Sequence, residues 1–203
     1  MEFSEAVLRR HMVRSFSAEP LGRDEVDLIL QAALRSPTAG NTQGTAWVAL
    51  EGPDQTALYF DATTDEAWRT RHKEWSDGLA RAPVVLLAYI SPDAYVDRYA
   101  EEDKATGGLG ETAAAWPVPY WIGDAAFGVM TVLLAAVDAG LGACVLGAFR
   151  GEAELAARLD VPPGWRLFCA VLLGHPDGAD HRSASLDRNS PKPSERIHRG
   201  RWG

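Results

Sequence analysis

Two guanidinium groups stand four residues apart in Arg10-His11-Met12-Val13-Arg14, where a predicted N-terminal helix gives way to a loop. A guanidinium group presents paired donors in a fixed plane, which suits phosphate and carbonyl oxygens. The cluster therefore indicates a site for an anion or a carbonyl group. A solvated basic turn is the alternative that these residues leave open.

A second segment, Ser36-Pro37-Thr38-Ala39-Gly40-Asn41-Thr42-Gln43, opens where a predicted helix ends at a proline. Small residues allow close approach of the backbone, and amide side chains can both donate and accept hydrogen bonds at the edge of a heterocycle. The segment is thus a candidate ligand loop. An ordinary Asn/Gly turn into the next strand is the competing interpretation.

A third segment, Leu141 to Phe149, reads LGACVLGAF and ends a predicted strand. Its second glycine, Gly147, leaves a bare backbone N–H that can point at a ligand atom. A plain turn from strand to helix explains the same letters, and the segment alone does not decide between the two.

Other kinds of chemistry are disfavoured by the composition. The net charge of −8 argues against a nucleic-acid groove, which needs a surplus of Lys and Arg. The histidines lack metal-ligand spacing, and His72 among them is expected at the surface or at a helix cap, so no metal site is expected. Cys144 and Cys169 lie in apolar runs without CxxC spacing, which indicates buried thiols and a reducing, cytoplasmic compartment. We see no signal peptide and no membrane span.

The elements that must position these segments follow from hydrophobic periodicity. Helices are expected at 2–11, 24–36, after Pro53, 65–80, 120–139 and 152–159. Strands are expected at 47–50, 84–90, 143–147 and 166–173. This mixture predicts one α+β domain over residues 1–203, and no GxGxxG follows a strand as a nicotinamide Rossmann domain would require.

The predicted helix at 120–139 is apolar almost all round, so it must be covered on every side, either inside the subunit or in a dimer core. The tail from about residue 175 is rich in Pro and Arg and has little periodicity. It is implausible as a domain of its own, and we expect it to extend over another surface, such as a partner subunit.

Aromatic residues gather where the chain is otherwise polar. Trp68, Trp75 and Trp116 stand in polar or loop-like surroundings, where large rings need a partner, a ligand or a lid. The long segment 95–121 is irregular and aromatic, which makes it a candidate substrate lid that could stack on a planar acceptor. A plain surface loop is the alternative.

Taken in order, the RHxxR-type start, the S-P-x-A-x-N-x-Q loop, the apolar helix leading into GLGA and the basic tail resemble the FMN-dependent nitroreductase family. The segment Trp116-Pro117-Val118-Pro119-Tyr120-Trp121 leads into the apolar helix. It is similar to the start of the central helix in an actinobacterial-looking branch of the family. The resemblance spans nearly the whole chain and is weakest over 51–115. It implies a three-layer α-β-α sandwich and an intertwined homodimer with FMN at the interface.

The resemblance also assigns cofactor residues. The phosphate, ribityl and ring-carbonyl side would be held by Arg10, His11, Met12 and Arg14. The other subunit would supply Pro37, Thr38 and Ala39 against the ring, with Asn41 and Gln43 near the pyrimidine or the ribityl chain. Backbone donors toward flavin N5 would come from Leu146 and Gly147, and a tail cation from Arg188 or Lys192. The substrate lid would include Trp116, Tyr120, Trp121 and Asp124.

The implied activity is hydride transfer from NAD(P)H to FMN, then reduction of a nitroaromatic, a quinone or a similar planar acceptor by a ping-pong mechanism. No catalytic side chain is required, although Arg14 is a candidate for stabilising the reduced ring. A non-catalytic flavin-binding or storage protein, a flavin-dependent dehydrogenase and a flavin-consuming enzyme are the alternatives. The sequence leaves open whether a deazaflavin replaces FMN, and whether NADH or NADPH is the donor.

Overall fold

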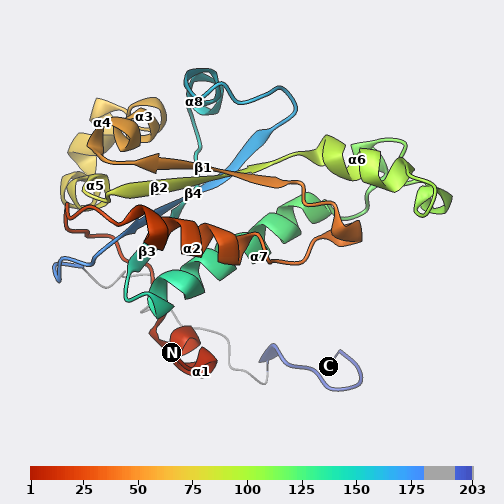
Figure 1. Cartoon of the computed structure of the whole chain (residues 1–203), viewed down its shortest axis with the longest axis horizontal. Helices are drawn as coiled ribbons and strands as arrows, with labels where there is room; N and C mark the ends of the chain where they lie inside the picture. The colour runs from red at the N-terminus through yellow and green to blue at the C-terminus, as the bar shows by residue number, and fades with distance from the viewer. Residues whose placement is uncertain (181–194, 203) are drawn as a thin grey trace.

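A four-stranded antiparallel sheet forms the centre of the protein (Figure 1). The computed structural model describes residues 1–180 and 195–202. The strands are β1 (Thr45–Glu51), β2 (Val84–Ile90), β3 (Gly142–Leu146) and β4 (Arg166–Gly174), arranged in the order β1-β2-β4-β3. The four predicted strands and the α+β class are confirmed.

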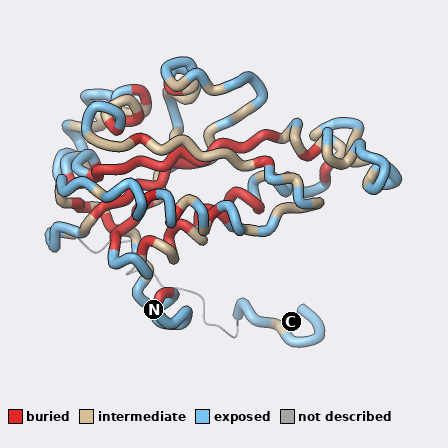
Figure 2. Tube along the Cα trace, in the orientation of Figure 1, coloured by how far each residue is buried: buried red, intermediate tan, exposed pale blue. Residues whose placement is uncertain are grey.

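Both faces of the sheet are covered, because its central strands are apolar throughout. All seven residues of β2 are buried, and Val84 pairs with Glu51 on one side and Leu173 on the other. Alternate side chains of β2 enter two separate cores, as the period of a strand requires. The buried band runs through the middle of the molecule in Figure 2.

Helices form the two outer layers of the sandwich. One face of the sheet carries α2 (Arg23–Ala33) and α7 (Tyr120–Asp138), whose apolar residues join the first core. The other face carries α3 (Pro53–Thr63), α5 (Lys73–Ala80) and α8 (Glu152–Arg158). A short helix, α1 (Phe3–Arg9), precedes this body at the lower edge of Figure 1. The three-layer arrangement is therefore as predicted.

The predicted helix at 65–80 is divided in two. The backbone leaves helical geometry at His72 (φ −119°, ψ 36°), which separates α4 (Glu66–Arg71) from α5. No proline or glycine marks this break in the sequence. On the α4 side of the break, Arg69 donates to the carbonyl of Phe60 and to the Thr64 hydroxyl. These contacts tie α4 to the end of α3.

The long helix α7 is covered on one side only. Its buried residues face the sheet and α2, whereas Ile122, Phe127 and Met130 on its other side are exposed, Phe127 by 52%. Of the two expected alternatives, cover on every side within the subunit is therefore excluded, and cover in a dimer core stays a prediction. Among the described residues, α7 is the helix with the length and composition to cross a membrane, but it packs on the sheet as a core helix does.

The predicted lid segment is more ordered than expected. It begins inside α6 (Pro92–Ala100), where Tyr95 is fully buried, and continues through 3-10 turns at Ala105–Gly107 and Ala113–Ala115. The buried ring of Trp116 packs edge-on against Tyr95, Tyr99 and Trp121, with centroids 4.7–5.9 Å away. These rings form an aromatic core for an arm that projects from the body (Figure 1).

Asp124 fastens this arm to the loop that follows α2. Its carboxylate is buried and accepts the backbone N–H of Ala39 at 2.7 Å and the hydroxyl of Tyr95 at 2.9 Å. Both hydrogen bonds are accepted by the same oxygen, Asp124 Oδ2, and both donors belong to the same chain. The resemblance places Asp124 in a substrate lid, and in the structure its carboxylate is an internal support of the arm.

We expect Asp124→Ala to lower the free energy of unfolding by about 3 kcal/mol, because it leaves a backbone N–H and a hydroxyl without an acceptor in a buried place. Urea denaturation measures this loss. Asp138→Asn, at the exposed end of the same helix, is the control and should cost roughly 0.5 kcal/mol or less. Equal losses for the two variants would contradict the supporting role of Asp124.

Candidate functional site

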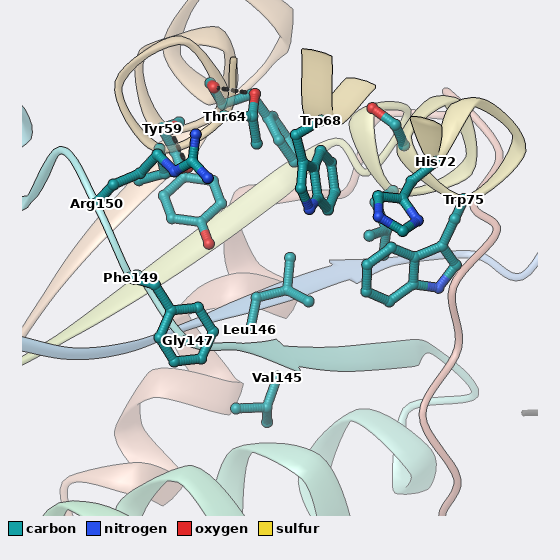
Figure 3. A pocket seen from close by; sticks show the side chains of 14 residues that line it. Tyr59, Thr64, Trp68, His72, Trp75, Val145, Leu146, Gly147, Phe149 and Arg150 are labelled. Carbon is teal, nitrogen blue, oxygen red and sulfur yellow. Dashed lines mark hydrogen bonds between the residues drawn. The ribbon is translucent and has the colours of Figure 1, made fainter. Parts of the chain in front are cut away.

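A cavity of about 410 Å³ opens where β3 ends, on the face of the sheet that carries α3, α4 and α5 (Figure 3). Its floor includes Val145, Leu146 and Gly147, so the glycine-containing segment singled out in the sequence does border a pocket. The remaining lining residues are Tyr59, Phe60, Thr63, Thr64, Trp68, His72, Trp75, Ser76, Leu79, Phe149 and Arg150.

Three rings form the wall opposite Leu146: Trp68 from α4, His72 from the break between the helices, and Trp75 from α5. The centroid of His72 lies 5.3 Å from that of Trp68 and 6.4 Å from that of Trp75, and the two indoles are 5.8 Å apart. The rings are tilted by 46–64° rather than stacked, so part of each face stays open to the cavity. Partly open aromatic rings beside a cavity are typical of a site for a planar ligand.

The polar groups of the cavity fall into two sets. Thr63, Thr64 and Arg150 are engaged, the hydroxyls with carbonyls of α3 and the guanidinium with Asp65. The side chains of His72 and Ser76 make no hydrogen bond within the described chain, whereas the Tyr59 hydroxyl has Thr63 as a neighbour. Burial raises the pKa of Tyr59 to about 12, so its hydroxyl keeps its proton near neutrality.

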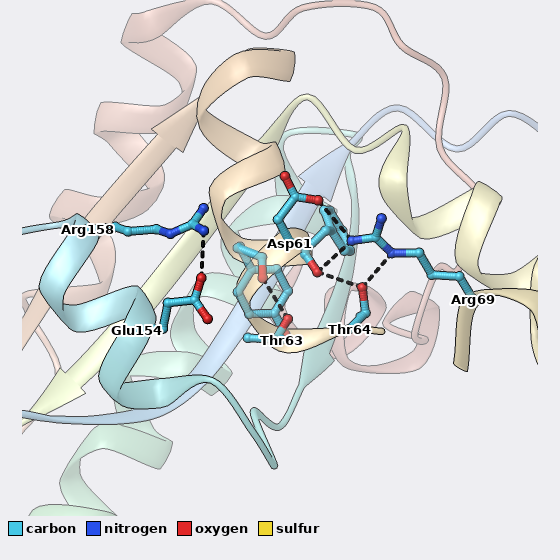
Figure 4. Close-up of polar contacts among 8 residues, drawn as sticks. Asp61, Thr63, Thr64, Arg69, Glu154 and Arg158 are labelled. Carbon is cyan, nitrogen blue, oxygen red and sulfur yellow. Dashed lines mark hydrogen bonds and ion pairs between the residues drawn. The ribbon is translucent and has the colours of Figure 1, made fainter. Parts of the chain in front are cut away.

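The aromatic wall is held in place by α3. Arg69 binds the Phe60 carbonyl, the Asp61 carboxylate and the Thr64 hydroxyl at 2.7–2.9 Å (Figure 4). Asp65 caps α4 by accepting the N–H of Trp68. These contacts fix the first turn of α4, which carries the Trp68 ring over the cavity.

The basic N-terminal segment runs beside β3. Met12 pairs with Ala143 in a parallel bridge, and the N–H of Val13 donates to the Ala143 carbonyl at 2.9 Å. Met12 packs against both cores, so its side chain belongs to the interior. The Arg14 guanidinium donates to the Met12 carbonyl and lies near Cys144, whose pKa burial raises to about 11 against the opposing effect of Arg14.

Asp177 joins this segment to the chain that follows β4. Its carboxylate accepts the N–H of Ala179 at 2.9 Å, the Ser15 hydroxyl at 2.8 Å and the Arg81 guanidinium at 2.6 Å. A second carboxylate, that of Asp180, accepts the N–H of Arg14 at 2.9 Å. The position of Arg14 is thus fixed from β3 and from residues 175–180.

The loop at 36–43 lies elsewhere, at the end of the sheet where β1 begins and the arm projects (Figure 1). Gly40, Asn41 and Gln43 have positive φ values of 53–64°, which non-glycine residues rarely adopt and which often mark functional loops. The Arg98 guanidinium holds the Gly40 carbonyl at 2.9 Å. The side chains of Asn41 and Gln43 remain exposed.

Within one chain, the structure therefore brings together only some of the residues that were predicted to contact the flavin and the substrate. Leu146 and Gly147 border the cavity, and the segment from Arg10 to Arg14 runs beside the same strand. Residues of the other loop (Pro37, Thr38, Ala39, Asn41 and Gln43) and of the arm (Trp116, Tyr120 and Trp121) are outside its lining. Arg188 and Lys192 lie outside the described residues.

Sequence reasoning missed the wall of the cavity. The spacing 68, 72, 75 places three rings on one helical face, which was the available signal, and the indoles were noted only as rings that need cover. His72 is exposed, as expected, yet its ring borders the cavity.

Comparison with known proteins shows the family to which the chain belongs. Residues 7–175 match the model described as the nitroreductase family, which is well over half of the chain. The chain belongs to the nitroreductase family. A 4-nitrobenzoate reductase of Nocardioides is 28% identical to this nitroreductase over 91% of the present chain and 85% of its own. An FMN reductase [NAD(P)H] of Bacillus subtilis is 25% identical over 89% of this chain and 65% of its own.

Solved structures share the fold of this family member. The nitroreductase CinD of Lactococcus lactis, in complex with chloramphenicol, superimposes with a TM-score of 0.77 at 16% identity, covering 98% of this chain and 100% of that one. A Desulfovibrio desulfuricans structure in complex with FMN gives a TM-score of 0.62 at 22% identity, covering 95% and 99%. The nitroreductase fold of this chain is thus established.

We expect Asp177→Asn to destabilise this nitroreductase near neutrality and to have no effect in strong acid. The hydrogen bond from the Ala179 N–H, then those from Ser15 and Arg81, hold the pKa of Asp177 below its usual value. A depressed pKa adds stability above the value in the unfolded chain, and that stability is lost as the pH falls through the folded-state value. Urea midpoints at neutral and acid pH measure the difference, and a difference that persists in acid would contradict the account.

Proposed function

We propose that this nitroreductase is an FMN-dependent oxidoreductase that takes reducing equivalents from NAD(P)H and reduces nitroaromatic, quinone or similar planar acceptors by a ping-pong mechanism. The observation that carries the proposal is the aromatic-walled cavity at Leu146 and Gly147. The names of the relatives, an FMN reductase [NAD(P)H] and a 4-nitrobenzoate reductase, and the FMN complex of the Desulfovibrio protein support it. The two free, buried cysteines agree with a cytoplasmic setting.

The residues of the cavity fit a flavin. A volume of about 410 Å³ is in the range of small-molecule sites. A fused ring system can lie against the flat indoles of Trp68 and Trp75 and the apolar side chain of Leu146. Polar contacts for its edge can come from Tyr59, His72 and Ser76. A flavin has the same combination of a large planar surface and one polar edge.

Bound FMN supplies the redox chemistry, accepting two electrons with a proton from the nicotinamide and passing them on. The chain holds and orients the cofactor. We assign phosphate and ribityl contacts to Arg10, His11 and Arg14, of which Arg14 is also placed to favour negative charge on the ring. The Gly147 N–H at the end of β3 is the backbone donor for the reacting side of the ring. A tail cation, Arg188 or Lys192, completes the phosphate site.

A homodimer completes the site in this proposal. The loop at 36–43 precedes the start of β1, and none of Pro37, Thr38, Ala39, Asn41 and Gln43 lines the cavity, so in this proposal they reach a flavin from a partner subunit. The exposed apolar face of α7, with Phe127 and Met130, and the exposed Leu34 after α2 provide a surface for that partner. Residues 175–180 pack on their own chain through Asp177 and Asp180, so the prediction that the tail packs on the partner from about residue 175 is wrong for this stretch.

The aromatic arm then covers the partner's acceptor site. Tyr120 is 49% exposed at the start of α7, and the neighbouring cluster of Trp116 and Trp121 gives it a rigid base. A planar acceptor could stack between this arm and the flavin. A storage protein would have the same arm but close the ring off, and a dehydrogenase would select one metabolite there.

The FMN-loaded protein is expected to oxidise NADH or NADPH in steady state when a nitroaromatic or a quinone is added. Initial rates over both substrate concentrations should give the parallel double-reciprocal lines of a ping-pong mechanism. A flavin-loaded protein that shows no turnover with either donor and either acceptor class would contradict the reductase and favour storage.

We expect Phe127→Glu to convert a dimer into a folded monomer, because a charge replaces an apolar ring that is already 52% exposed within the chain. Light scattering after size exclusion measures the mass, and circular dichroism checks the fold. Thr70→Glu adds a charge at an exposed position on α4 and should remain dimeric. A wild-type monomer, or an unchanged mass for Phe127→Glu, would contradict the interface.

A further inference from the structure

We propose that Arg98 is a positioning residue for the loop at 36–43, which it joins to the arm as one rigid unit that enters the partner's site. The proposal rests on the proposed function, in which this loop reaches a flavin from a partner subunit. Arg98 itself belongs to α6 and lies outside the lining of the cavity. Its role follows from the backbone conformation of the loop, the hydrogen bonds of the guanidinium and the packing of two glycines on α6.

The loop has a backbone conformation that its own residues do not favour. Asn41 and Gln43 have φ values of 53° and 54°, in the left-handed region that residues with a Cβ rarely adopt. Such conformations persist only where neighbouring structure imposes them. One neighbour of the loop is α7, where Asp124 accepts the N–H of Ala39, and another is α6. The loop therefore depends on contacts from outside itself.

The Arg98 guanidinium connects the loop to the arm. Its Nε donates to the Gly40 carbonyl at 2.9 Å, while its two terminal nitrogens donate to the two carboxylate oxygens of Asp103 at 2.6 and 2.7 Å. A paired bond of this kind fixes the plane of the guanidinium as well as its position. The Arg98 side chain is only 23% exposed. Asp103 thus orients Arg98, and Arg98 holds the loop at Gly40.

Two glycines allow the backbone of this region to lie directly on aromatic rings of α6. A Cβ at Gly40 would come within 2.8 Å of Cε2 of Tyr99. At Gly44, just after the loop, a Cβ would come within 2.4 Å of Cε2 of Tyr95. The Gly44 carbonyl also accepts the N–H of Ser91, the residue before α6, at 3.0 Å. Contacts at both glycines leave the loop little freedom to move separately from α6.

A loop that is already ordered binds its ligand more tightly than one that must first be ordered. The apparent affinity of a site falls in proportion to the fraction of molecules that are competent to bind. In the proposed dimer the loop lies against the partner's flavin, so Arg98 strengthens FMN binding without having to touch the cofactor. The same guanidinium links the loop to the arm that covers the acceptor site.

Hydrogen–deuterium exchange of the full-length protein tests the link. Arg98→Met keeps a long side chain but has no donor, and we expect the amides of residues 39–43 to exchange about tenfold faster than in the wild type. The Kd of oxidised FMN, measured by tryptophan fluorescence, should rise about fivefold because fewer molecules have the loop in its binding conformation. Saturating FMN should restore slow exchange, since binding selects the ordered loop.

Matched variants separate this role from a general loss of stability. Arg158→Met removes an exposed ion pair with Glu154 on α8, and it should leave both the loop exchange and the FMN affinity unchanged. Glu101→Gln removes the other carboxylate near Arg98, at 3.1 Å, and should have little effect because the bonds to Gly40 and Asp103 remain. Asp103→Asn should change both measurements in the direction of Arg98→Met.

Wild-type exchange in the loop of Arg98→Met, or faster exchange with an unchanged Kd for FMN, would overturn the proposal and leave the proposed function intact. If Arg98→Met does not fold, Asp103→Asn gives the same test, and wild-type exchange in that variant would overturn the proposal. A wild-type protein that binds no FMN would overturn the proposed function. The exchange rates would still decide whether Arg98 orders the loop.

Discussion

The structure depends on a sheet whose two faces are both apolar and must both be covered. β2 is buried along its whole length, so water has to be excluded on either side of it. Helices α2 and α7 cover one face. On the other face α3, α5 and α8 cover the middle but leave the end of β3 open, and that gap is the cavity. The site is therefore a consequence of incomplete cover, which a flat cofactor can complete.

The segments that could bind a ligand, 10–14 and 36–43, are fixed by contacts with different elements of the fold. The Arg10–Arg14 segment is bound to β3 through Ala143, and the next residue, Ser15, donates a hydrogen bond to Asp177. The loop at 36–43 is bound to the start of α7 through Asp124. Each part of the predicted site is thus held by its own contacts within the chain. In the proposed dimer, a second chain would bring its loop at 36–43 to the cavity, with the apolar face of α7 between the two chains.

Much of the fold could be predicted from periodicity. The run Val84–Ile90 reads as a buried strand because no polar residue interrupts it, and the structure gives the same bounds. The break at His72 could not be read, since no proline or glycine stands there and the contacts of Arg69 with the end of α3 form only in the folded chain. In the site, the segment Leu141–Phe149 was singled out because a predicted strand ends there beside a glycine, and the resemblance to the family then assigned Leu146 and Gly147 to the flavin. The aromatic wall was missed because three rings and a strand end, about 70 residues apart in sequence, meet only in the folded chain.

The central claim is that FMN binds at the end of β3, beneath the rings of α4 and α5. A crystal structure of the FMN-loaded protein tests it most directly. We predict that the isoalloxazine ring lies between Leu146–Gly147 and the wall formed by Trp68, His72 and Trp75, with the loop at 36–43 of a second chain against it. A flavin bound elsewhere, or a ring contacted by one chain alone, would contradict the account.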